Sequence, residues 1–135
     1  MEAKFSWYNA EQTIMLIEVS GQAMSWDELI NVIEMQHVWL NDITHKAHSI
    51  FDLRQVRSRV PRGNALLSGK RLMDYSHPNE DLTVLLSKHV ILRPLIEIVD
   101  RTYRMRQYTS RCRYVDTMEQ ALDAIQRYDA SQMTK

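Results

Sequence analysis

A group of arginines near the middle of the chain offers the clearest binding chemistry in the sequence. Between residues 54 and 71 there are six cations and no acid. The cations are Arg54, Arg57, Arg59, Arg62, Lys70 and Arg71. Because guanidinium groups bind carboxylates and phosphates through paired hydrogen bonds, the first four of these arginines form the candidate surface for a partner protein or an anion.

The elements around these arginines determine what they are able to bind. The apolar run at residues 49–53 is too short for a helix and predicts a buried strand that ends just before the arginines. In open α/β sheets, ligands bind beyond the carboxyl ends of parallel strands, and the helix expected from about Ala65 adds the positive end of its dipole. A solvated loop is an equally good interpretation, in which the arginines pair with Asp74, Asp100 or the acids of the preceding helix.

Ser58 is the only hydroxyl-bearing residue between positions 54 and 63, and it is the one candidate for phosphorylation there. A phosphate on Ser58 would be surrounded by arginines, which form charge-assisted hydrogen bonds with phosphate oxygens. A single serine in a loop is more often a solvated turn residue, and we favour that interpretation.

The residue types that most often carry catalysis or bind metals are present but poorly arranged. His45 and His48 are three residues apart in a segment expected to enter a strand, where side chains at this spacing do not converge on a metal. Cys112 lies between two arginines that a strand would direct to the other face, which favours a small buried hydrophobe over a reactive thiol. The three glycines are too scattered for a phosphate-binding loop. We therefore expect no catalytic residue, no metal and no cofactor.

The charges cancel over the whole chain but are unevenly distributed along it. The 135 residues include 17 basic and 17 acidic ones, which gives a formal net charge of zero. Residues 5–45 hold six acids and no lysine or arginine, whereas residues 46–113 hold 14 basic residues and six acids. The neutral total argues against a surface built for nucleic acid, while the uneven distribution is compatible with anion or partner binding on one face.

Length and composition predict one domain, residues 1–135, in a reducing compartment. With 44% hydrophobic and 25% charged residues, the chain is able to bury a core and cover it. A single cysteine excludes an intrachain disulfide. No apolar run reaches the roughly 18 residues that a membrane-spanning helix needs, and the start lacks the apolar stretch of a signal peptide. We therefore expect a cytoplasmic protein with no integral membrane segment.

Hydrophobic periodicity and capping signals predict strands that alternate with helices. Capping boxes at Ser25–Glu28 and Thr117–Gln120 mark two helix starts, and Pro94 places a third near Leu92 because proline is tolerated in a first turn. The expected elements are a hairpin of residues 5–8 and 13–19, a helix over 25–43, a strand over 49–53, a helix over 65–75, a strand over 82–86, a helix from about 92, a strand near 111–114 and a helix from 117, with a frayed tail after about 130. This order predicts an α/β fold: a mixed β-sheet of about five strands with an N-terminal β-hairpin and about four α-helices.

Several short motifs accompany this element order along nearly the whole chain. They are Val19-Ser20-Gly21, Ser25-Trp26-Asp27-Glu28-Leu29, Ile50-Phe51-Asp52-Leu53, His77-Pro78-Asn79 and Tyr114-Val115-Asp116-Thr117. Together they resemble the STAS domains, the SpoIIAA-like family of anti-sigma-factor antagonists. The resemblance implies a STAS-like fold and a non-enzymatic bacterial signalling module. Its partner would be a protein, such as a kinase or an anti-sigma factor, or a second copy of the chain.

The sequence departs from this family in the loop that follows Asp52 and Leu53. Family members commonly carry there a serine or threonine that a partner kinase phosphorylates, in an Asp-Ser-Gly-like context. Ser58 has no acid beside it and no glycine directly after it, so we expect a module without the usual phosphorylation motif. The alternative is a domain that binds a small anionic ligand or a lipid headgroup through the basic loop. An enzyme is the weakest of the three hypotheses, because no nucleophile and base are placed together.

Overall fold

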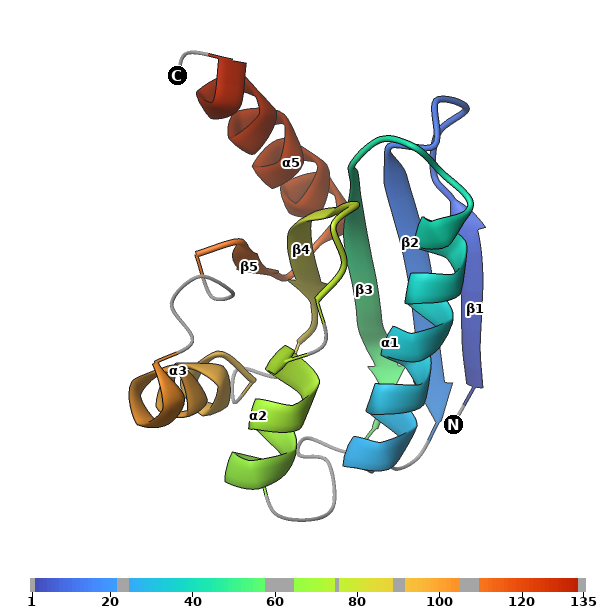
Figure 1. Cartoon of the computed structure of the whole chain (residues 1–135). Coiled ribbons are helices and arrows are strands. Elements are labelled where there is room, and N and C mark those ends of the chain that lie inside the picture. The colour runs from blue at the N-terminus through green and yellow to red at the C-terminus, as the bar shows by residue number, and fades with distance from the viewer. Residues whose placement is uncertain are drawn as a thin grey trace.

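The computed structural model describes residues 2–21, 25–57, 65–74, 76–88, 92–104 and 110–133. Strands alternate with helices along these residues (Figure 1). In chain order the elements are β1 (Glu2–Trp7), β2 (Ile14–Gly21), α1 (Trp26–Asn41), β3 (Ala47–Val56), α2 (Ala65–Asp74), β4 (Glu80–Leu86), α3 (Leu92–Tyr103), β5 (Cys112–Val115) and α5 (Met118–Met133). The prediction of an α/β fold with a five-stranded mixed sheet is confirmed.

The strands lie in the sheet in the same order as in the sequence. β1 pairs antiparallel with β2 and forms the expected N-terminal hairpin, whereas β2, β3, β4 and β5 run parallel to one another. Each crossover therefore moves one strand further in the same direction. α1 packs on one face of the sheet and α5, after the last strand, packs on the other, while α2 lies against α1 and α3 lies against α2.

Two hydrophobic cores fill the two faces of the sheet, because alternate residues of a strand point to opposite sides. The core under α1 consists of Met15, Ile17, Val19, Val32, Ile33, Leu40, Ile43, Ala47, Phe51, Leu53 and Val56. The core under α5 consists of Ile50, Leu82, Val84, Leu86, Ala121 and Ile125. β3 contributes to both cores and is therefore buried on both faces over most of its length.

Both ends of α1 are held by side chains. The predicted capping box is confirmed: Ser25 Oγ accepts from the Glu28 amide at 3.1 Å, and Glu28 Oε1 accepts from the Ser25 amide at 3.2 Å. At the other end, Asn79 Nδ2 donates to the carbonyls of Leu40 and Ile43, each at 3.0 Å. These carbonyls have no partner within a helix, so Asn79 fastens the end of α1 to the turn before β4.

The other two predicted helix starts also agree with the structure. Thr117 Oγ1 accepts from the Gln120 amide at 3.1 Å, which caps α5, but Gln120 Oε1 accepts from the amide of Asp116 at 2.9 Å and not from that of Thr117. Pro94 lies in the first turn of α3. Its missing N–H is harmless there, because first-turn amides have no partner within the helix.

Several boundaries differ from the sequence prediction, among them the start of β1, which is Glu2, and the ends of β3 and α5. β3 continues to Val56, because its parallel pairing with β2 resumes after a register shift and places Gly21 opposite Val56. Arg54 is therefore part of a strand and not of the loop after it. α5 continues to Met133, beyond the expected frayed end, and Tyr128 packs against the core under α5 close to that end.

A polar cluster is buried between α1, β3 and β4. Gln36 is fully buried, and its Nε2 donates to Ser49 Oγ at 2.7 Å and to Glu80 Oε1 at 3.4 Å. Thr83 Oγ1 donates to the same Glu80 oxygen at 3.1 Å. Burial raises the pKa of Glu80, and the hydrogen bonds from Thr83 and Gln36 and the charge of Arg111 only partly oppose this shift. Compared with unfolding, folding therefore makes the carboxyl of Glu80 harder to ionise.

This cluster makes a prediction about pH and stability. A raised pKa in the folded state means that the contribution of Glu80 to stability is fully present below the ordinary glutamate value and is lost as pH rises through the raised value. Glu80→Gln keeps a neutral, hydrogen-bonding side chain at every pH. We expect it to unfold with a free energy about 1–3 kcal/mol higher than wild type at pH 8, with a smaller difference at pH 4.

Urea unfolding followed by tryptophan fluorescence measures both free energies. Glu11→Gln is the matched control, because Glu11 is exposed in the hairpin loop. An equal effect of the two substitutions at pH 8 would contradict a raised pKa of the buried Glu80 carboxyl. So would a gain in unfolding free energy from Glu80→Gln that does not change with pH.

Candidate partner-binding surface

The predicted arginine Arg54 lies near the carboxyl end of β3 and binds an acid of its own strand. Its Nε donates to Asp52 Oδ1 at 3.0 Å and its Nη2 donates to Asp52 Oδ2 at 2.9 Å. The Arg54 amide also donates to Asp52 Oδ1, at 3.1 Å. Residues two apart in a strand point to the same face, which brings the two side chains together. Paired bonds of this kind are the strong form of an arginine–carboxylate contact.

The Asp52–Arg54 pair is partly shielded from water. The side chain of Asp52 is 10% exposed and that of Arg54 is 33% exposed. Burial alone would raise the pKa of Asp52, but the hydrogen bonds and the charge of Arg54 outweigh it and hold that pKa below its usual value. Glu18, which pairs with Asp52 across β2 and β3, also favours the charged form of Arg54. The guanidinium of Arg54 therefore already interacts with acids of the sheet.

Arg57 follows the end of β3 and is exposed. Its amide donates to the carbonyl of Gly21 at 3.0 Å, which places it beside the carboxyl end of β2. Within the described part of the chain its guanidinium makes no ion pair. The other candidates, Ser58, Arg59 and Arg62, lie outside the described residues.

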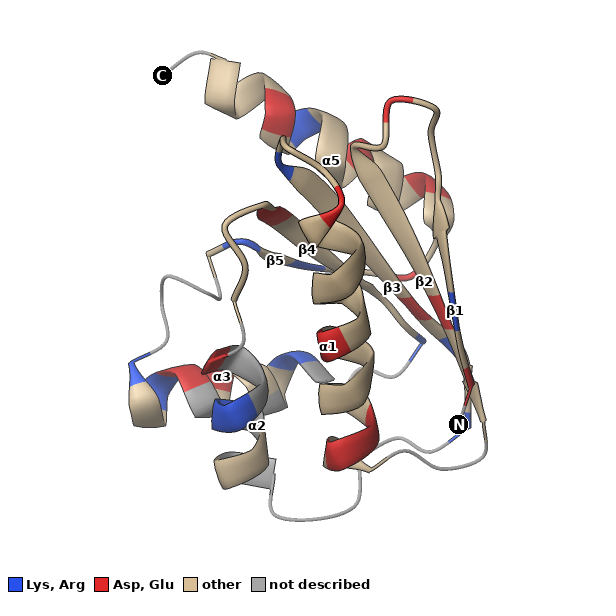
Figure 2. Cartoon of the chain, turned by 45° about the vertical axis from the view of Figure 1, so that its right-hand side comes forward, with Lys and Arg blue, Asp and Glu red and all other residues tan. Residues whose placement is uncertain are grey.

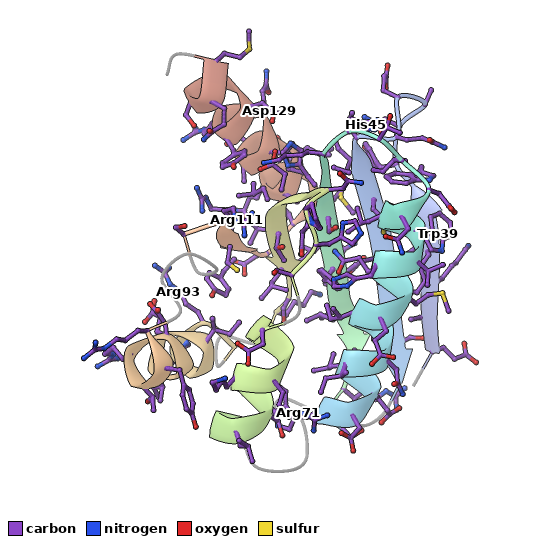
Figure 3. The ribbon with its side chains drawn as sticks, viewed as in Figure 1. Trp39, His45, Arg71, Arg93, Arg111 and Asp129 are labelled. Carbon is purple, nitrogen blue, oxygen red and sulfur yellow. The ribbon has the colours of Figure 1, made fainter. Side chains whose placement is uncertain are left out.

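The last two cations of the basic segment belong to α2 and pair with acids. Lys70 Nζ lies 2.7 Å from Asp74 Oδ2, one helical turn away. Arg71 Nη1 lies 3.7 Å from Asp27 Oδ1 at the start of α1, and both side chains are well exposed, at 54% and 84%. Figure 3 shows Arg71 directed toward the lower end of α1. The pairing of basic residues with acids of the preceding helix, one of the two open interpretations, thus holds for Arg71.

These positions form the surface that we call the carboxyl edge: Arg57 after β3, Asp27 at the start of α1 and Arg71 on α2. A second group of arginines follows later in the sequence, namely Arg101, Arg104, Arg106, Arg111 and Arg113, and of these Arg111 lies at the other end of the sheet. Arg111 Nη1 donates to the carbonyl of Glu80 at 3.4 Å, at the amino end of β4. Because the strands are parallel, Arg111 and Arg57 lie at opposite ends of the sheet. The carboxyl edge therefore presents cations and acids close together, a pattern that suits a protein surface better than a simple anion.

The two histidines considered as metal ligands make separate hydrogen bonds. His45 Nε2 lies 2.8 Å from the carbonyl of Gln12. The Leu82 amide donates to His48 Nδ1 at 3.2 Å, so the hydrogen of that ring lies on Nε2, which donates to Asp129 Oδ1 at 2.8 Å. No group of three or more potential ligands occurs among the described residues. Both ring nitrogens of His48 are used to hold α5 against β3 and β4.

Cys112 is buried in β5, at the far edge of the sheet from β1.

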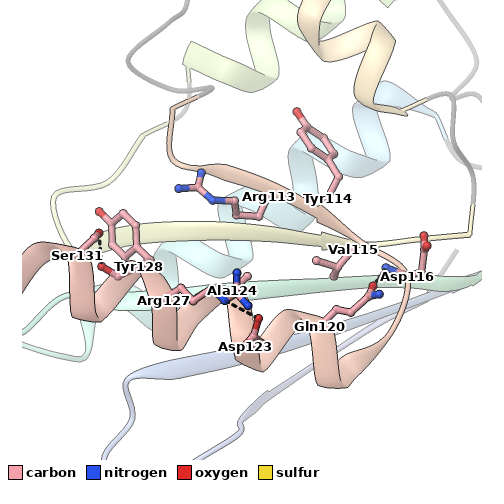
Figure 4. A pocket seen from close by; sticks show the side chains of 10 residues that line it. All are labelled: Arg113, Tyr114, Val115, Asp116, Gln120, Asp123, Ala124, Arg127, Tyr128 and Ser131. Atoms are coloured by element: carbon pink, nitrogen blue, oxygen red, sulfur yellow. Dashed lines mark hydrogen bonds and ion pairs between the residues drawn. The ribbon is translucent and has the colours of Figure 1, made fainter.

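Beside β5, a groove of about 650 Å³ runs between the strand and α5, and the sequence did not predict it (Figure 4). Its walls carry both charges, with Arg113 on β5, Asp116 at the end of the strand, and Asp123 and Arg127 paired at 2.9 Å on α5. A groove with balanced charges does not favour an anionic ligand.

Tyr128 lines this groove and links α5 to β4. Its hydroxyl donates to Asp81 Oδ1 at 2.6 Å, and its ring packs edge-on against His48. Burial and the Asp81 carboxylate raise the pKa of Tyr128 to about 12. The phenol therefore remains neutral and serves as a hydrogen-bond donor. No local sequence pattern predicts the contact with Asp81, because Asp81 and Tyr128 are 47 residues apart along the chain.

Comparison with known proteins finds no match to this chain. No family model matches the chain, and neither a curated protein nor a solved structure matches it. Among the residues that the structure describes, no helix combines the length and apolar character needed to cross a membrane.

We predict that the shielded Asp52–Arg54 pair contributes more to the free energy of unfolding than the exposed Asp123–Arg127 pair. Because the pKa of Asp52 is lowered, its stabilising contribution is present above the ordinary aspartate value and is lost as pH falls toward the lowered value. Asp52→Asn removes the charge and at least one acceptor. We expect it to lower the free energy of unfolding at pH 7 by about 1–3 kcal/mol and to weaken the loss of stability on acidification.

The control is Asp123→Asn, because Asp123 pairs with Arg127 on the surface, where the two side chains are 53% and 81% exposed. An exposed pair contributes about 0–1 kcal/mol. Chemical unfolding between pH 3 and pH 7, in steps of about 1 unit, measures both variants. If Asp52→Asn cost no more than Asp123→Asn, the shielded pair would not stabilise the end of β3.

Proposed function

We propose that this chain is a non-enzymatic STAS-like regulatory or protein-interaction module of the anti-sigma-factor-antagonist type, without the usual phosphorylatable-serine motif. The observation that carries the proposal is the carboxyl edge. There the guanidinium of Arg57 is exposed and makes no ion pair within the described residues, and the exposed side chains of Asp27 and Arg71 pair with each other. Mixed exposed charges at the end of a rigid sheet suit recognition of a complementary protein surface.

Two further features support an interaction module. The element order β1-β2-α1-β3-α2-β4-α3-β5-α5 agrees with the one that the STAS resemblance implies. The polar groups that most often do chemistry are engaged in holding the fold, as His48 is by Asp129 and Tyr128 is by Asp81. Such groups serve positioning and stability more readily than catalysis.

The alternative, a domain that binds a small anionic ligand or a lipid headgroup, would use the same arginines. An incoming anion would have to compete with Asp52 for Arg54, whose guanidinium already has a bidentate partner. Arg71 is likewise close to Asp27. The protein partner is therefore the better supported of the two.

Site-specific crosslinking in the source cells tests the proposal. Arg57→benzoylphenylalanine places a photoreactive group on the carboxyl edge, and Arg127→benzoylphenylalanine places the same group on the exposed face of α5 as the control. We expect a defined protein adduct from position 57 and not from position 127. An adduct between two copies of the chain would identify the partner as a homodimer.

A charge reversal completes this test. Arg57→Glu should reduce the yield of partner recovered with the chain by about tenfold or more, because it sets like charges against each other in the interface. The free energy of unfolding should change by no more than about 0.5 kcal/mol, since Arg57 is exposed. Equal recovery with Arg57→Glu and wild type, or equal adducts from positions 57 and 127, would overturn the carboxyl edge as the partner surface.

A further inference from the structure

The outer side of β1 is an open sheet edge. β1 is the first strand of the sheet, and among the described residues it pairs with β2 alone, over six residues without a register shift. Figures 1 and 2 show no other described element beyond it. The Tyr8 amide donates to the Ile14 carbonyl at 2.8 Å, so the even-numbered residues of β1 bond to β2. The backbone N–H and C=O groups of Ala3, Phe5 and Trp7 therefore point outward, ready to pair with another strand.

An apolar shelf lies next to this edge on the α1 face. The rings of Phe5 and Trp7 contact that of Trp39, with centroids 5.9 and 6.0 Å apart. Met35 lies one helical turn before Trp39, on the same side of α1, and is 47% exposed. Val38, on the outer side of the same helix, is 54% exposed. A strand added to β1 would place every second side chain against this shelf.

The charged residues of α1, which carries Met35 and Trp39 of the shelf, are all acidic. Residues 5–45 contain six acids and no lysine or arginine. Glu34, next to Met35, and Asp42, which follows the end of α1, are exposed, and Figure 2 shows acidic positions but no basic one along that helix. Lys4, the cation of β1, lies opposite Glu18 on the other face of the sheet. A cationic partner is therefore complementary to this surface, whereas a second copy would bring like charges together.

We infer that β1 and the shelf of Phe5, Trp7, Trp39 and Met35 bind an extended, cationic segment of a partner protein, which adds to the sheet as a strand. Backbone hydrogen bonds to Ala3, Phe5 and Trp7 supply the pairing, and apolar side chains of the segment cover the shelf. The acidic surround favours lysine and arginine in that segment. This surface is separate from the carboxyl edge, so the inference does not depend on the partner proposed there.

Amide chemical shifts of the full chain, recorded during titration with a peptide, test the inference. The probe is acetyl-Lys-Lys-Val-Thr-Val-Lys-Lys-amide, whose first and last lysines share the face of the valines, and the control probe has glutamate in place of each lysine. We expect the lysine peptide to shift and protect the amides of Ala3, Phe5 and Trp7, with binding that weakens as sodium chloride is raised from about 0.05 to 0.5 M. The glutamate peptide should bind at least about tenfold more weakly.

Two substitutions locate the binding. Ala3→Pro removes an outward N–H without removing a hydrogen bond to β2, and Ala3→Ser is its matched control. Met35→Lys changes the shelf but leaves β1 intact, so it tests the binding site even if the proline disturbs the hairpin. We expect Ala3→Pro and Met35→Lys each to weaken binding of the lysine peptide about tenfold or more, and Ala3→Ser to leave it unchanged.

Three results would overturn the inference. The first is the absence of shifts on β1 at millimolar peptide, and the second is equal binding of the lysine and glutamate peptides. The third is a dimer of the chain alone, seen by light scattering, that Ala3→Pro dissociates, because a second copy would then occupy the edge.

Discussion

The polar side chains of a strand buried on both faces must find partners inside the protein, and this constraint organises the structure around β3. Ser49 receives a hydrogen bond from Gln36 of α1, His48 donates to Asp129 of α5, and Asp52 binds Arg54 of the same strand. Unpaired polar groups at these depths would cost about 1–3 kcal/mol each. The helices on the two faces are therefore positioned by hydrophobic burial and also by these few directed bonds.

Local features of the fold were predictable because their signals lie within a few residues. The capping box at Ser25, the cap at Thr117 and the place of Pro94 follow from residue types at fixed spacing, and the structure confirms them. The bond between Gln36 and Glu80 joins residues 44 positions apart, and no local pattern encodes such a contact. The sequence predicted a strand over 82–86, which left Glu80 outside it, whereas β4 begins at Glu80 and the fold buries this residue.

The candidate surface shows the same division between local and distant information. The arginine-rich composition indicated where to look, and Arg57 is exposed at the end of β3. The sequence did not reveal that pairing of β2 with β3 resumes beyond Glu18, and that pairing draws Arg54 into the strand beside Asp52. In the described structure the cations of the basic segment thus have two roles. Some, such as Arg54, stabilise the fold, whereas Arg57 remains available to bind a partner. Charge density alone does not separate the two roles.

The consecutive strand order has a consequence for how the chain acquires its structure. Each new strand adds beside the one just formed, so each pairing closes only the segment between consecutive strands, and the sheet is able to grow in the direction of synthesis. α5 is the exception, because the bond from His48 to Asp129 spans 81 residues. Until α5 docks, Ile50, Leu82 and Val84 remain uncovered on one face of the sheet. α5, which is synthesised after every strand of this sheet, thus closes an apolar surface otherwise open to aggregation.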